Sequence, residues 1–227
     1  KKKLNTVKYH KIIMNEIYTI LKILNRTNII LRNSYKDKVL LKYSQEMFQK
    51  NSIQKVFGSR KPISVDIRAI LYEIPKMYSV TDKIDGERHL LFIDGKNVLL
   101  ISSNLDVKHT GISLSNENFN KTIIDGELII KKNKHIFMAF DILFLNKMDL
   151  RKKYNLNQRL SYLYKFMKNC LNITVNNSTN LTNMNDIKKF YSKNIDSYIS
   201  ELNKTIELSD NFVIWYKYYI FPKGIEE

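Results

Sequence analysis

A lysine, an aspartate, a glycine and an arginine lie close together in this chain at a spacing that suits chemistry on a nucleotide phosphate. The run is Lys83-Ile84-Asp85-Gly86-Glu87-Arg88. A lysine amine attacks phosphorus when a nearby carboxylate orients it, and a glycine lets phosphates approach the backbone closely. The pattern predicts Lys83 as a nucleophile, and a solvated lysine beside a turn is the simpler alternative.

Two later segments strengthen this prediction. They are Ile123-Ile124-Asp125-Gly126-Glu127-Leu128 and Phe137-Met138-Ala139-Phe140-Asp141-Ile142. Lys83 precedes Asp125 by 42 residues (125 − 83), and Glu127 precedes Asp141 by 14 residues (141 − 127). Because side chains two positions apart on a strand share a face, Asp125 and Glu127 can present both carboxylates to one ligand.

In order and separation, the three segments resemble motifs I, III and IIIa of the covalent nucleotidyltransferases, which include mRNA capping guanylyltransferases and polynucleotide ligases. Residues 81–88 are most similar to the guanylyltransferase region of the capping enzymes of large nucleocytoplasmic DNA viruses. The resemblance covers roughly residues 55–220. It implies an α+β fold of the nucleotidyltransferase type (ligase and capping enzyme, ATP-grasp-like), with antiparallel sheets and a helical N-terminal segment.

The resemblance also implies roles at the nucleotide. Lys83 would be the catalytic residue that bonds to GMP, beside Asp85 and Gly86 in the nucleotide site. Arg88 would contact the ribose and the 5′ end of the acceptor. An amine attacks only when neutral, so the pKa of Lys83 must fall below its ordinary value of about 10.4, and Arg88 is one candidate cation that would lower it.

Further residues are assigned to the base and to a metal ion in the same way. Glu127 would bind the ribose or a metal-bound water. Phe137 and Phe140 are both candidates to stack on the purine, with Phe140 preferred, while Asp141 would hold structure. The best match to motif IV is Asp210 followed by Asn211 where the family has glycine. We therefore expect Asp210 and Glu127 to serve a Mg²⁺ or Mn²⁺ ion.

Motif V, a lysine pair that grips the α-phosphate in this family, has no match, because Trp215-Tyr216-Lys217 lies too close to motif IV. We expect motif V and the OB domain beyond Glu227. Residues 1–55 would be a helical segment, such as the end of an upstream RNA triphosphatase domain or a linker, and residues 56–227 the guanylyltransferase domain. A methyltransferase is a further candidate domain of the same polypeptide.

Composition agrees with a polyanionic partner. The net charge is +16, from 38 Lys and Arg against 22 Asp and Glu, which favours RNA, although an AT-rich genome would also enrich lysine. Cys170 is the only cysteine, which indicates a reducing compartment, and the resemblance implies host cytoplasm (a viral factory) or the virion. No run of 18 apolar residues occurs, so no membrane partner is expected.

Hydrophobic periodicity predicts the elements that position these motifs. Helices are expected at about residues 8–25, 37–50, 64–73, 157–171 and 185–204, with Asn157 as the N-cap of the fourth. Strands are expected at about residues 78–81, 90–93, 98–101, 122–132, 135–145 and 212–219. Asp94-Gly95-Lys96-Asn97 is a hairpin turn by its composition.

The function expected from these features is that of an mRNA guanylyltransferase. It would form a Lys83–GMP intermediate from GTP and transfer GMP to the 5′ diphosphate end of RNA. Two alternatives stay open at this point. One is an ATP-dependent DNA or RNA ligase with a lysine–AMP intermediate, and the other is a non-catalytic RNA-binding relic of the same fold.

Overall fold

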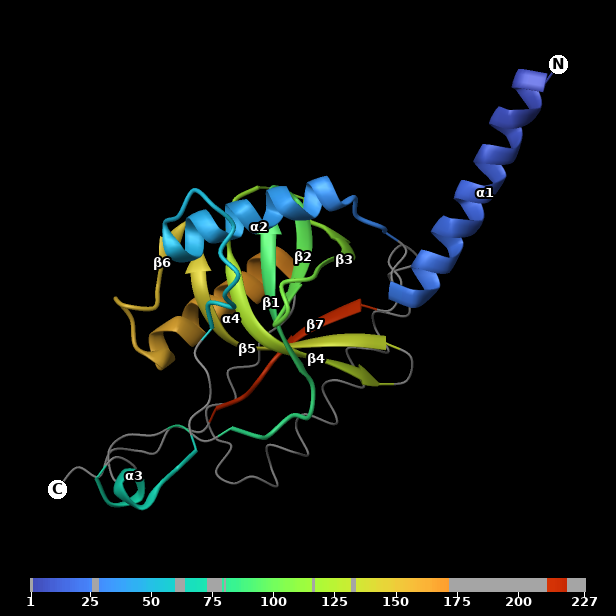
Figure 1. Ribbon diagram of the computed structural model, residues 1–227. Helices are drawn as coiled ribbons and strands as arrows, with labels where there is room; N and C mark the ends of the chain where they lie inside the picture. Colours follow the sequence, from blue (N-terminus) through green and yellow to red (C-terminus); the bar gives the residue numbers. More distant parts are fainter. Residues whose placement is uncertain are drawn as a thin grey trace.

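The computed structural model describes residues 2–25, 29–59, 64–72, 79, 81–115, 117–131, 134–171 and 212–219. Within this part, the chain forms one sheet with a helix against each face, and two further helices lie away from the sheet (Figure 1). The helices are α1 (Lys2–Asn25), α2 (Asn33–Phe48), α3 (Ile67–Tyr72) and α4 (Leu156–Leu171). The strands are β1 (Glu87–Asp94), β2 (Asn97–Ser102), β3 (Val107–Ser113), β4 (Ile123–Lys131), β5 (Lys134–Leu145), β6 (Met148–Asp149) and β7 (Phe212–Tyr216).

The sheet has the strand order β3-β2-β1-β4-β5-β6, and β7 pairs with β5. The neighbours along this path are antiparallel, whereas β5 and β7 run parallel. The predicted hairpin turn is confirmed, since Asp94 pairs with Asn97 and Gly95 has a φ of +62°. The α+β class with an antiparallel sheet is therefore confirmed, with one parallel pair added.

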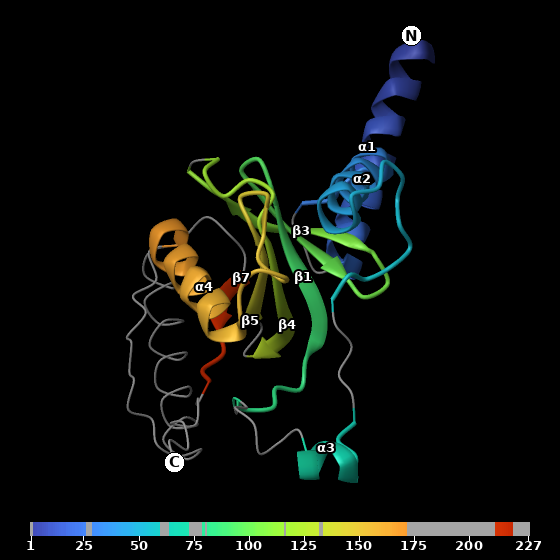
Figure 2. The same ribbon diagram turned by 90° about the vertical axis from the view of Figure 1, so that its left-hand side faces the viewer.

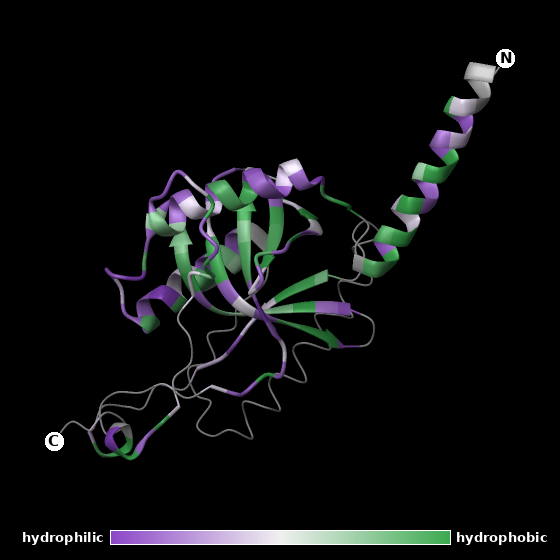
Figure 3. Ribbon diagram, viewed as in Figure 1, coloured by the Kyte–Doolittle hydropathy of each residue, from purple (hydrophilic) through white to green (hydrophobic). Residues whose placement is uncertain are grey.

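Two hydrophobic cores lie on opposite faces of the sheet (Figure 2). Side chains of β1 alternate between them: Leu91 belongs to the core under α4, and Leu90 belongs to the core under α2. Hydrophobic residues dominate the strands (Figure 3), as expected for a sheet covered on both faces. The sheet is thus packed on both faces where β1, β4 and β5 carry the motif residues.

Helix α2 is tied to the sheet by both packing and charge. Val39 and Tyr43 are fully buried in the core that they share with β1. The Lys42 ammonium lies 2.6 Å from a carboxylate oxygen of Asp94 at the end of β1. After α2, the Gly58 N–H donates to the Tyr43 hydroxyl at 2.8 Å, which directs the following residue toward β4. Residues before position 55 therefore help to build the face on which the motifs lie.

Several expectations about the elements need correction. The N-cap of α4 is Asn155 rather than Asn157, because Asn155 and Gln158 exchange side-chain-to-backbone hydrogen bonds, both of 3.0 Å. Strand β3 was not predicted, and Thr81 lies in a loop instead of a strand. The helix expected at 185–204 and the residue Asp210 lie outside the described residues. Among the residues described, no helix has the length and apolar character needed to span a bilayer.

Candidate active site

Lys83 lies in the loop of residues 81–86, immediately before β1, and points into solvent. Its side chain is 85% exposed and forms an ion pair with Asp85, which is 87% exposed. The hydrogen bond and the charge of Asp85 raise the pKa of Lys83, and the same contact lowers the pKa of Asp85. The orienting role of Asp85 stays a prediction, and the pKa of Lys83 is shifted in the direction opposite to the one expected for an attacking amine.

Arg88, at the start of β1, is held by Asp125 of β4. Its Nε and Nη2 donate to the two carboxylate oxygens at 3.1 and 2.9 Å, and the Asp125 side chain is 4% exposed. Burial raises the pKa of Asp125, while Arg88 and the hydroxyl of Ser59 oppose that shift. The expectation that Arg88 is the cation acting on Lys83 is not supported, since its charge is matched by Asp125.

Two cations lie over the ring of Phe140 in β5, one from Arg88 of β1 and one from Lys217, which follows β7. The Arg88 guanidinium carbon lies 5.3 Å from the ring centre, and Nζ of Lys217 lies 5.4 Å from it. Both distances are within the range of a cation–π contact. A flat ring with positive charge beside it is a suitable surface for a nucleotide, whose base stacks and whose phosphates are anionic. Stacking of Phe140 on a purine stays a prediction.

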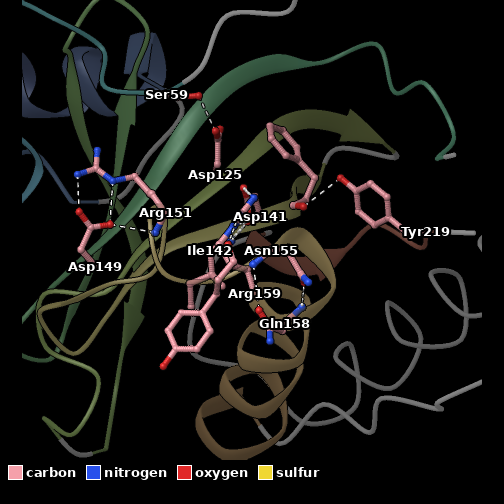
Figure 4. Close-up of polar contacts among 12 residues, drawn as sticks. Ser59, Asp125, Asp141, Ile142, Asp149, Arg151, Asn155, Gln158, Arg159 and Tyr219 are labelled. Carbon is pink, nitrogen blue, oxygen red and sulfur yellow. Dashed lines mark hydrogen bonds and ion pairs between the residues drawn. The ribbon is translucent and has the colours of Figure 1, made fainter. Parts of the chain in front are cut away.

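The neighbouring carboxylate of Asp141 points toward α4 instead. It accepts hydrogen bonds from Nε and Nη2 of Arg159 at 2.8 and 2.9 Å (Figure 4). The hydroxyl of Tyr219 donates to the Phe140 carbonyl at 3.0 Å, which fastens the same point of β5 to the segment after β7. Asp141 therefore joins the sheet to α4, in agreement with the structural role expected for it.

Lys217 follows β7 directly, and its side chain lies at the site. From the sequence it was excluded as a motif V lysine because it lies too close to Asp210 in the chain. The side chain is 7% exposed, and its Nζ lies 3.8 Å from Oε2 of Glu127. Burial lowers the pKa of Lys217, the charge of Glu127 raises it in part, and the charge of Lys83 adds to the lowering. The Thr81 hydroxyl donates to the Tyr218 carbonyl at 2.7 Å, so the loop with Lys83 is tied to the segment with Lys217.

Glu127 of β4 carries an oxygen with unused hydrogen-bonding capacity. Its Oε2 is buried and has no hydrogen-bond partner, since 3.8 Å to Lys217 is too long for a hydrogen bond. No group of three or more metal-ligand side chains occurs among the described residues. Mg²⁺ is commonly held by one or two carboxylates together with substrate phosphates. Glu127 therefore fits as one such ligand.

Gly86 is required by packing against β4. A Cβ at this position would lie 2.9 Å from the Leu128 carbonyl oxygen and 2.7 Å from Cγ2 of Ile129. Those approaches are closer than real Cβ atoms make, and one of them involves backbone. The glycine thus lets the Lys83 loop lie directly on the strand that carries Glu127.

The structure gathers three of the residues expected at the nucleotide, Arg88, Glu127 and Phe140, and leaves the Lys83–Asp85 pair at the exposed edge beside them. It adds two residues that were not predicted, Lys217 and Ser59. A lysine directly after an apolar strand was a usable signal for the first. A single serine in a loop gave no signal for the second.

Comparisons with known proteins give a consistent result. The profile of the family described as mRNA capping enzyme, catalytic domain, matches residues 11–211. A probable mRNA-capping enzyme of Acanthamoeba polyphaga mimivirus is 30% identical to the chain over 221 residues. The aligned region is 93% of this chain and 18% of that protein, so the chain spans less than a fifth of this relative.

Proposed function

This chain belongs to the mRNA capping enzyme family, whose catalytic-domain profile it matches, and we propose that it is an mRNA guanylyltransferase. We propose further that its fold is the ATP-grasp-like nucleotidyltransferase fold of ligases and capping enzymes. The observation that carries the proposed activity is the pair of cations, Arg88 and Lys217, at the Phe140 ring beside the loop of Lys83. Nucleotidyl transfer needs a nucleophile and positive charge at the phosphates, and this arrangement supplies both.

In the first step, the neutral amine of Lys83 attacks the α-phosphorus of GTP. A nitrogen–phosphorus bond forms, the bond from the α-phosphorus to the bridging oxygen breaks, and pyrophosphate leaves with that oxygen. The amine loses a proton in the process. Because Asp85 raises the pKa of Lys83, the pair between them has to open before attack.

In the second step, a terminal oxygen of the 5′ diphosphate of RNA attacks the same phosphorus. The nitrogen–phosphorus bond breaks, Lys83 recovers its proton, and GMP is joined to RNA through a 5′–5′ triphosphate bridge. Nη1 of Arg88 has no hydrogen-bond partner within the described part of the chain, so it can contact the nucleotide or the RNA end. Lys217 supplies a second, buried positive charge near the same ring.

A divalent ion, Mg²⁺ or Mn²⁺, belongs to the proposed reaction and would shield the charge of the triphosphate. The orphaned Oε2 of Glu127 is the described atom that suits it. Asp210, outside the described residues, stays a proposed second ligand. Its replacement by alanine should raise the metal concentration needed for the first step, and an unchanged metal titration would remove it from this role.

Whole-protein properties are also proposals, because the chain matches only 18% of its relative. They include RNA as acceptor, linked triphosphatase, OB and methyltransferase domains, and a place in the viral factory or virion. Incubation with α-labelled GTP or ATP and metal, followed by denaturing electrophoresis, tests the central activity. Acid-labile label from GTP supports guanylyl transfer, label from ATP alone indicates a ligase, and no label indicates a binding module.

A further inference from the structure

We propose that Ser59, which precedes every recognised motif, is a positioning residue that aligns Arg88 for its substrate by holding Asp125. The Ser59 hydroxyl donates to Oδ2 of Asp125 at 2.5 Å (Figure 4). The same oxygen accepts from Nη2 of Arg88, while Oδ1 accepts from Nε. Three donors from two elements therefore set the plane of one buried carboxylate.

The plane of this carboxylate decides where the guanidinium points. A bidentate pair of arginine and carboxylate is nearly coplanar, so rotation of the carboxylate turns the arginine fork with it. The Ser59 hydroxyl resists that rotation by occupying a third position on the carboxylate. With both ends of the fork bound to Asp125, Nη1 is the part of Arg88 directed away from the pair, and its direction follows from the orientation of Asp125.

Ser59 can act in this way because its own position is well determined. The segment after α2 is held by Gly58 N–H donating to the Tyr43 hydroxyl, and by Gln54 N–H donating to the Ser44 hydroxyl at 2.9 Å. Tyr43 and Ser44 are both fully buried in α2. The helix before the motifs is thus linked to the arginine of the site through a short series of hydrogen bonds.

This inference rests on the proposed function for its catalytic consequence, but the alignment itself can be measured without catalysis. Nitrogen-15 NMR of the full chain reports the Nε–H of Arg88, which is assigned by its loss in Arg88→Lys. In the wild type this signal should be sharp and protected from solvent exchange. Ser59→Ala should broaden or shift it, Ser59→Thr should restore it, and the exposed control Ser52→Ala, in the same segment, should leave it unchanged.

A double-mutant cycle on adduct formation then tests whether Ser59 acts through Arg88. Ser59→Ala should slow formation of the GMP adduct by about tenfold when Arg88 is present. In the Arg88→Lys background, where the fork is absent, the same change should have less than about twofold effect. Ser59→Cys, whose thiol is a weak donor, is the second variant if the alanine variant does not fold.

The possible results separate the two claims. An Arg88 Nε–H signal that is unchanged in Ser59→Ala overturns the positioning role. Equal slowing of adduct formation by Ser59→Ala in the wild-type and Arg88→Lys backgrounds also overturns it, because that is the result expected of a purely structural serine. A wild type that forms no adduct with GTP contradicts the proposed function, and the NMR comparison still decides whether Ser59 aligns Arg88.

Discussion

Nζ of Lys217 and Oε2 of Glu127 lie 3.8 Å apart, although the two residues are separated by 90 positions in the chain (217 − 127). The contact exists because β7 pairs in parallel with β5, while β5 pairs with β4, which carries Glu127. The N–H of Lys217 continues this pairing by donating to the Ala139 carbonyl at 2.7 Å. The strand register therefore brings a buried ammonium to the carboxylate that is proposed to hold the metal.

Replacement of Lys217 by methionine should slow adduct formation by roughly 100-fold, the usual effect of removing one electrostatic contact to developing charge. Lys153→Met is the matched control, since Lys153 is an exposed lysine that also lies over an aromatic ring, that of Tyr154. Single-turnover labelling with GTP measures both variants. A rate within about twofold of the wild type in Lys217→Met would show that its charge is not used.

Asp85→Asn should lower the pKa of Lys83, because the hydrogen bond and charge of Asp85 are what raise it. The amine of the variant then becomes neutral at lower pH than in the wild type. Reductive methylation with carbon-13, followed by an NMR titration of the Lys83 signal, measures this directly. A pKa that stays equal or rises in the variant would contradict the ion pair at this position.

Gly86→Ala should lower the free energy of unfolding by about 1–3 kcal/mol, as overpacking against fixed backbone does. The added Cβ would lie 2.9 Å from the Leu128 carbonyl oxygen. Chemical denaturation compares it with Glu87→Ala, a change at an exposed neighbour. Equal stability of the two variants would mean that the loop moves away from β4 without cost.

Asp141→Asn should lower the free energy of unfolding by about 1–3 kcal/mol, because the amide has one acceptor oxygen and can keep only one of the two hydrogen bonds from the Arg159 guanidinium, without the carboxylate charge. The rate of adduct formation per folded molecule should remain that of the wild type. Loss of labelling with unchanged stability would instead place this carboxylate in the reaction.

Local patterns in the sequence predicted those helices and strands that are determined by residues close together in the chain. The short, continuous apolar runs on both sides of Gly95 predicted the β1–β2 hairpin, and the two apolar runs flanking residues 132–133 predicted β4 and β5. Of the residues that the motifs singled out for the site, the structure brings Arg88 and Phe140 into contact, and their roles toward a nucleotide stay predictions.

Contacts across the chain could not be predicted in this way. The parallel pairing of β7 with β5 follows from tertiary packing, so the position of Lys217 after an apolar strand did not indicate that it would lie beside Glu127. The short separation between Asp210 and Lys217 along the sequence argued against Lys217 as a site residue. Its position in space is instead decided by the register between β7 and β5. The pairing of Asp125 with Ser59 depends on how α2 docks, which no motif describes.

In the proposed reaction, Lys83 carries the nucleotide. The most direct measurement is to incubate the protein with GTP and Mg²⁺ or Mn²⁺, digest it under neutral or alkaline conditions, and locate the added GMP by mass spectrometry. The proposed function predicts GMP on the peptide that contains Lys83, and predicts no adduct in Lys83→Ala at unchanged melting temperature, since that side chain is 85% exposed. GMP on another lysine, or an adduct that persists in Lys83→Ala, would contradict the account.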